Sequence, residues 1–166
     1  MSENGRDFWS DEIIVESVLT PELVLREQAG ILAEKTKGIV RGEVETIEQP
    51  VENLDDYLKP VFSTEAECKQ YTHTLYLVVP ALDNYRYALV SVEHDFEPYP
   101  CKAAYHPRTN TILDANVMGI KSCGTPDELV QWLAMTLKHP TTTRIIRALI
   151  TRASHPRQVA SVSAKG

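Results

Sequence analysis

Residues 71–94 have the sequence YTHTLYLVVPALDNYRYALVSVEH, which predicts two β-strands joined by a tight turn. Both halves are rich in Val, Leu, Tyr and Thr, the side chains that fit a pleated and half-buried surface. Asp83-Asn84 separates the halves, and this pair tolerates the positive φ that a two-residue hairpin turn requires. The stretch therefore predicts a hairpin with strands over Thr72–Leu82 and Tyr85–His94.

A two-residue turn would fix the register of this hairpin. The pairs expected across it are Leu82–Tyr85, Val79–Ala88, Leu77–Val90, Leu75–Val92 and His73–His94. Because side chains alternate along a strand, one face of the hairpin would be almost wholly apolar and must be covered by helices. The other face would carry Thr74, Tyr76, Val78 and Pro80 against Tyr87, Leu89, Ser91 and Glu93. Both faces would then be too apolar for a plainly solvated surface.

Helices are predicted on both sides of the hairpin. Thr20-Pro21-Glu22 combines an N-cap hydroxyl, a proline at the first helical position and an acid in the first turn. Thr125–Glu128 repeats these signals and places a glutamate for a capping box. Pro140 ends that second helix, and a last helix is predicted over Thr141–Ser154.

Three further strands are predicted, at Ile39–Glu48, Cys101–His106 and Thr111–Val117. The last two would be joined by a loop over Pro107–Asn110, which would place Ala103 opposite Asp114 and Cys101 opposite Asn116. Gly119–Gly124 would then break the strand pattern before the second helix.

The order of elements predicts an α+β fold, with an antiparallel β-meander of about five strands. An N-terminal helix and two C-terminal helices would pack on one face of this sheet. Residues 20–154 would form the single domain, and residues 155–166 a flexible tail. Residues 1–19 would form a partly ordered arm that packs on the domain or meets another subunit. Phe8, Trp9 and Ile13–Val15 are too apolar for a disordered tail.

Composition is that of an ordinary globular protein, with 166 residues, 43% of them hydrophobic and 24% charged. No apolar run approaches the roughly 18–20 residues that a membrane span needs, and no signal peptide is visible at the polar N-terminus. Cys68, Cys101 and Cys123 are too widely spaced for a disulfide framework or a zinc motif. These observations predict a cytoplasmic protein.

Charge is distributed unevenly along the chain. Residues 1–100 hold twenty acidic and eight basic side chains, a balance of −12, whereas residues 101–166 hold three acidic and nine basic ones, a balance of +6. Arg144 and Arg147 are neighbours on the surface of the last helix, where they could meet phosphates. The segment lacks interleaved aromatic residues and the whole chain has a net charge of −6, which weakens the case for nucleic acid.

Histidine and cysteine residues supply the candidate chemistry. His73 and His94, beside Glu93 and Asp95, could hold zinc or a similar metal. A third ligand at a defined spacing is missing, so an ordinary cross-strand pair is the simpler interpretation. No metal or cofactor is therefore predicted.

Two cysteines could act as nucleophiles. Cys101 has His94, His106 and Asp114 as possible partners, but the predicted pairing puts His106 on the opposite face of the sheet. Cys123 precedes a capped helix, whose dipole favours thiolates. Packing in a strand, and a loop position without a role, are the simpler interpretations.

A non-catalytic protein–protein interaction module is the function predicted, of adaptor, inhibitor, immunity-like or chaperone-like type. The pattern resembles small bacterial α+β proteins, which implies a bacterial source and no particular activity. The predicted partner-binding residues are Tyr76, Tyr85, Tyr87, Arg144 and Arg147, because Tyr and Arg dominate interface cores. The partner would be another protein or a second copy in a twofold dimer. The alternatives are a small enzyme with a Cys or His site, and a nucleic-acid-binding accessory protein.

Overall fold

The structure is a computed structural model that describes residues 10, 18–50, 69–107 and 119–155. Within these residues, the helices are α1 (Pro21–Lys35), α3 (Pro126–Lys138) and α4 (Pro140–Ser154). The strands are β1 (Arg41–Pro50), β2 (Lys69–Val79), β3 (Tyr85–His94), β4 (Cys101–Tyr105) and β5 (Ile120–Cys123). A short 3₁₀ turn, η1 (Pro80–Leu82), separates β2 from β3.

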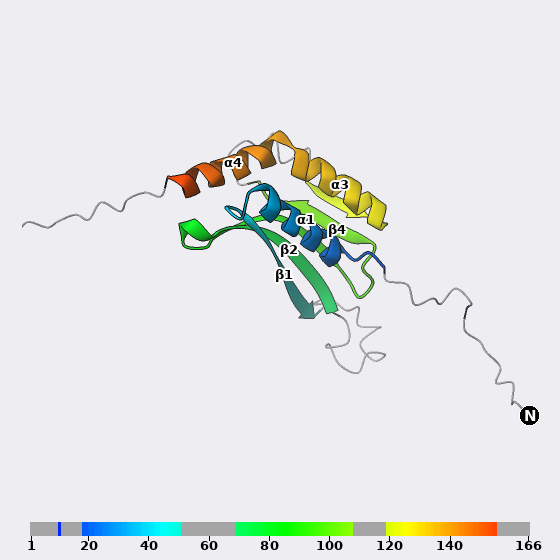
Figure 1. Ribbon diagram of the computed structural model, residues 1–166. Coiled ribbons are helices and arrows are strands. Elements are labelled where there is room, and N and C mark those ends of the chain that lie inside the picture. The colour runs from blue at the N-terminus through cyan, green and yellow to red at the C-terminus, as the bar shows by residue number, and fades with distance from the viewer. Residues whose placement is uncertain (1–9, 11–17, 51–68, 108–118, 156–166) are drawn as a thin grey trace, which may run out of the picture.

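All five strands form one antiparallel sheet in the order β1-β2-β3-β4-β5. The three helices lie together on one face of this sheet, with α1 over β1 and β2 and with α3 and α4 joined end to end (Figure 1). The hydrophobic core lies between the sheet and this helical layer. The predicted α+β fold, with one N-terminal and two C-terminal helices, is confirmed.

The helix starts follow the predicted capping. The Thr20 side chain accepts a hydrogen bond from the backbone N–H of Leu23, and Thr125 accepts one from Glu128 N–H at 3.3 Å. The Glu128 carboxylate reaches back to the Gly124 N–H at 2.6 Å. α4 starts at Pro140, one residue before its predicted start, because the His139 Nδ1 accepts a hydrogen bond from the Thr141 N–H. Local signals therefore fix where the helices begin.

The predicted register of the hairpin is wrong. Leu75 lies opposite Val90, Leu77 opposite Tyr87 and Val79 opposite Tyr85. One cause is η1, since Pro80 ends β2 and the connection spans five residues instead of two. Asp83 and Asn84 do adopt the expected positive φ, at 54° and 56°.

The second cause is a β-bulge. The register shifts between Leu75 and Tyr76, so β3 carries one residue, Leu89, that has no partner in β2. Beyond the bulge the side chains of β3 change face, and Leu89 and Val90 are both buried. Tyr87 and Leu89, predicted on the outer face, therefore belong to the core under the helices.

The pairing predicted for β4 is also wrong. Its neighbour in the sheet is β5, with Cys101 opposite Cys123 and Ala104 opposite Ile120. The segment Gly119–Gly124 was predicted to break the strand pattern, yet it contains β5. The predicted strand over residues 111–117 lies outside the described residues.

α1 approaches the sheet closely at one point. A Cβ added to Gly42 of β1 would lie 2.4 Å from the Ala29 Cα and 2.6 Å from the Ala29 Cβ. Glycine at position 42 and the small Ala29 therefore let the helix backbone sit directly on the strand. Gly30, next to Ala29 on the same helix, would place a Cβ in open space.

We expect Gly42→Ala to destabilise the protein by about 1–3 kcal/mol, because the added methyl overlaps the α1 backbone. Urea denaturation measures this change. The matched control is Gly30→Ala, which should stabilise the protein by about 0.5–1 kcal/mol, since alanine favours the helix and meets no neighbouring atom. Equal stability of Gly42→Ala and the parent protein would contradict the close packing of α1 on β1.

Candidate functional site: a groove in the helical layer

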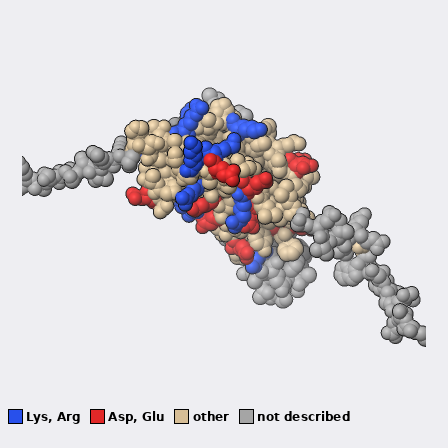
Figure 2. All heavy atoms as spheres, viewed as in Figure 1, with Lys and Arg blue, Asp and Glu red and all other residues tan. Residues whose placement is uncertain are grey.

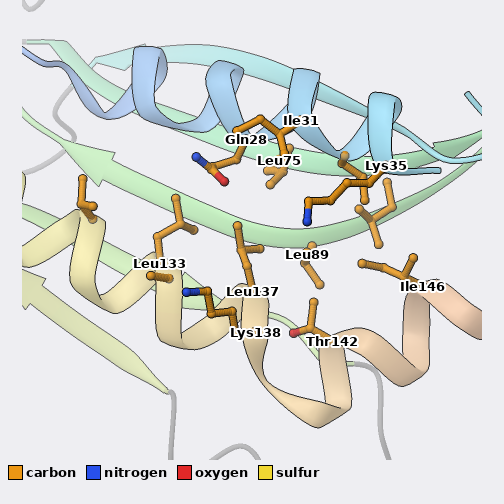
Figure 3. Close-up of a pocket in the computed structure, with 14 residues that line it drawn as sticks. Gln28, Ile31, Lys35, Leu75, Leu89, Leu133, Leu137, Lys138, Thr142 and Ile146 are labelled. Carbon is orange, nitrogen blue, oxygen red and sulfur yellow. The ribbon is translucent and has the colours of Figure 1, made fainter. Parts of the chain in front are cut away.

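A groove opens between α1 on one side and α3 and α4 on the other (Figure 3). Its volume is about 400 Å³, within the roughly 300–1,000 Å³ range of ligand sites in proteins. The floor is the sheet, and consists of Leu75, Leu77 and Leu89. The bulge in β3 supplies one of these three leucines. The groove is therefore an apolar cleft over the middle of the sheet.

The groove walls are held apart by separate contacts with the sheet. α1 is seated at Gly42, on the β1 edge. The bend between α3 and α4 is fixed by buried hydroxyl groups: Thr142 Oγ1 donates to the Thr136 carbonyl at 2.7 Å and lies 2.8 Å from the Tyr105 hydroxyl. Because each wall is anchored on its own strand, the gap between them is part of the fold.

Apolar side chains continue from the floor up to the rim. Leu133 and Leu137 of α3 and Ile146 of α4 line the wall (Figure 3). Ile31 of α1 and Val130 of α3 also line the groove and stay 38% and 42% exposed. Large apolar side chains that face one another across an open cleft mark a surface that gains stability when it is covered.

Two lysines give the groove a positive charge. Lys35 from α1 and Lys138 from α3 both line the groove; the ammonium group of Lys35 points into the space between the walls, and Lys138 lies along α3 (Figure 3). Within the described residues, neither lysine forms an ion pair. On the same side of the molecule, Lys and Arg side chains gather over the helical layer, with acidic ones among them (Figure 2). The groove is thus suited to an apolar group that carries negative charge.

A pair of histidines meets elsewhere, at the far end of β2 and β3. His73 lies opposite Val92 and His94 opposite Tyr71, so the predicted direct pairing of the two histidines is wrong. The rings still meet diagonally, with 2.9 Å between their Nε2 atoms. His73 is 4% exposed, and Tyr71 stacks on His94.

When both histidines are neutral, the donor and the acceptor of each hydrogen bond in this pair can be assigned. The Asp95 carbonyl can only accept, so His94 Nδ1 donates to it at 2.6 Å. His94 Nε2 then accepts from His73 Nε2, and His73 Nδ1 accepts from the Thr46 hydroxyl at 2.8 Å. Burial, together with the nearby charge of His94, lowers the pKa of His73. Among the described residues no group of three or more potential ligands is placed to hold a metal ion.

The two described cysteines lie side by side in the core. Cys101 pairs with Cys123 across β4 and β5, and both thiols are buried. Burial, with Cys123 adjacent, raises the pKa of Cys101 to about 12. Burial and the Glu128 carboxylate also raise the pKa of Cys123. Cys123 ends a strand and does not lie in the loop where it was predicted, and a protonated buried thiol is a poor nucleophile.

His106 does not complete a catalytic arrangement with Cys101. Its Nε2 lies 2.7 Å from Ser91 Oγ, on the face of the sheet opposite to Cys101. Asp114, the third member of that hypothesis, lies outside the described residues.

The residues predicted to bind a partner do not form one surface. Tyr87 is buried in the core and its hydroxyl donates to the His106 carbonyl at 3.3 Å, so its predicted place on the outer face is wrong. Tyr76 is half-buried, with the Arg86 guanidinium 4.0 Å from its ring centroid. Tyr85 is 41% exposed.

Arg144 and Arg147 are both exposed on α4, and neither lines the groove. Lys35 and Lys138 were not among the residues predicted to bind a partner. Both lysines close a helix, where a basic residue is expected for the helix dipole alone. No local signal indicated that the two would line opposite walls of one groove.

Comparison of the chain with protein-family models, curated protein sequences and solved structures found no match in any of the three. In the described part of the chain, no helix has the length and apolar character to cross a membrane.

We expect the free energy of unfolding to fall as the pH drops below about 6.5, because the unfolded chain takes up a proton that buried His73 resists. Because the pKa of His73 is lowered in the folded protein, its contribution to the free energy of unfolding is fully present above about pH 6.5. This contribution is lost as the pH falls towards the pKa that His73 has in the folded protein. Urea denaturation between pH 7.5 and 5 measures the slope. His73→Gln should reduce this slope, and part of it should remain, because burial also lowers the pKa of His106.

Cys101 and Cys123 should not react with an aromatic disulfide reagent at pH 8 in the folded protein. A rise in pKa from 9 to about 12 lowers the thiolate fraction of Cys101 roughly 10³-fold. The experiment uses Cys68→Ser, which leaves only these two thiols. Both should react in urea, and one rapidly reacting thiol under native conditions would restore the enzyme hypothesis.

Proposed function

We propose that this protein is a non-catalytic protein–protein interaction module of the bacterial cytoplasm, of adaptor, inhibitor, immunity-like or chaperone-like type. The observation that carries the proposal is the apolar groove between α1 and the α3–α4 pair. Its floor is leucine, its rim is exposed isoleucine and valine, and its walls are anchored independently. The partner contributes an apolar segment that lies between the walls.

The groove suits a helical segment best. Amphipathic helices bind to other proteins by laying apolar residues, spaced three and four apart, into a hydrophobic cleft. The groove provides a matching row of contacts, because the wall residues Leu133 and Leu137 are themselves four apart on α3. A few large side chains buried there would supply most of the binding energy.

The two alternative functions have less support. An enzyme with a cysteine nucleophile would depend on thiols that are buried and protonated. Nucleic-acid binding through Arg144 and Arg147 would use an exposed face of α4 that has no matching row of aromatic residues.

The experiment is affinity capture of partners from the native host with the full chain as bait. We expect Ile31→Asp and Val130→Asp to weaken capture of the specific partner at least about 30-fold, which corresponds to about 2 kcal/mol for a central interface residue. Each introduces a charge at a half-exposed position, so circular dichroism should show an unchanged fold.

Two comparison variants test the other surfaces. Tyr85→Ser alters the exposed tyrosine, and Arg144→Glu with Arg147→Glu alters the basic face of α4. Both should capture the partner as the parent protein does. Loss of capture in either variant, with capture retained by Ile31→Asp, would move the docking surface away from the groove.

A further inference from the structure

We infer that the groove takes the N-terminal arm of a second copy of this chain, so that two copies exchange arms in a twofold dimer. The groove takes residues 7–19 of the arm predicted over residues 1–19, and these thirteen residues, DFWSDEIIVESVL, are called the arm below. This inference rests on the proposed function, because it names the segment that the groove holds. Four observations carry it: composition, charge, the point at which the arm leaves the domain, and length.

Composition and charge make the arm a complement of the groove. Seven of its thirteen residues are large and apolar, and four are acidic, with no lysine or arginine among them. The groove has the opposite layout, with a leucine floor and two lysines that have no ion pair within the described residues. Carboxylates of the arm would neutralise Lys35 and Lys138 while its apolar side chains cover the floor.

The arm leaves the domain at the start of α1. The Tyr99 hydroxyl donates to the Leu19 carbonyl at 2.9 Å, which fixes the arm to the domain beside the start of α1. Thr20 is the N-cap of α1 and has the extended backbone that is usual at that position, with φ −76° and ψ 155°. Val18 and Leu19 are 55% and 43% exposed. These side chains are available to a neighbouring molecule.

The arm is longer than the groove. Thirteen residues span about 20 Å as a helix and up to about 43–47 Å when extended. The stretch of α1 that lines the groove, from Gln28 to Lys35, is only about 10 Å long. When each copy gives its arm to the other, the same contact is made twice, and the assembly closes as a dimer without further growth.

The first experiment measures mass and tryptophan exposure on the full chain. The protein has two tryptophans, Trp9 in the arm and Trp132, which is 5% exposed in the core. We expect a dimer by light scattering at about 10 μM, with Trp9 shielded from acrylamide. Ile31→Asp should give a monomer in which Trp9 is quenched several-fold more strongly. A Trp9→Phe variant of each protein isolates the signal of Trp132.

The second experiment is a charge exchange. Lys35→Glu with Lys138→Glu should weaken the dimer about tenfold or more, because like charges then face one another. Adding Glu12→Lys with Glu16→Lys should restore it. The charge-matched control is Arg144→Glu with Arg147→Glu, which makes the same change outside the groove and should leave the dimer intact.

Three results would overturn the inference. A monomer with exposed Trp9 would show that the arm has no place in the groove. A monomer with shielded Trp9 would assign the groove to the chain's own arm. A dimer that survives both Ile31→Asp and the lysine substitutions would form through another surface. If Ile31→Asp abolishes partner capture while the parent protein is a monomer with exposed Trp9, the proposed function stands without the arm.

Discussion

One extra residue in β3 governs both faces of the sheet. The bulge beside Leu75 and Tyr76 turns Leu89 towards the helices and takes Tyr87 with it into the core. The groove floor gains a leucine, and the outer face loses two large apolar groups. What remains on that outer face is held by polar contacts such as the 2.8 Å ion pair between Arg86 and Glu45. In the described part of the chain, all helices lie on the other face of the sheet.

The groove follows from two further constraints on that layer. α1 must sit where Gly42 leaves room for Ala29, and α3 and α4 must bend where the buried Thr142 hydroxyl meets the Thr136 carbonyl and the Tyr105 hydroxyl. Neither position can move towards the other without losing a contact that packing or hydrogen bonding requires. The cleft is thus a consequence of optimised contacts on both sides of it, and its apolar lining is what a binding surface needs.

The fold was accessible from the sequence wherever the deciding signals were local. Thr20-Pro21 and Thr125-Pro126 predicted helix starts correctly, and Asp83-Asn84 predicted the left-handed turn residues. The strand register was not accessible, because it depended on a 3₁₀ turn at Pro80 and on a bulge that no pattern of alternation reveals. The pairing of Cys101 with Cys123 was not predicted either, because predicting it requires knowing which strands are neighbours in the sheet.

The candidate site was less predictable from the sequence than the fold. Each groove residue had a sufficient local explanation: leucines as core, and lysines as helix ends. Only the tertiary arrangement brings Lys35 and Lys138 to opposite walls of one cleft. The apolar content of residues 8–15 was visible in the sequence, but its relation to the groove was not.

The hydroxyl contacts at the bend between α3 and α4 make the spacing of the groove walls independent of the side chains that select an occupant. The angle of the bend is set by Thr136, Thr142 and Tyr105, of which only Thr142 also lines the groove. Substitutions at Ile31 or Val130 can therefore change which occupant is accepted while the spacing of the walls stays constant. Proteins with this fold could therefore differ in specificity at Ile31 and Val130 and keep the same contacts at the bend.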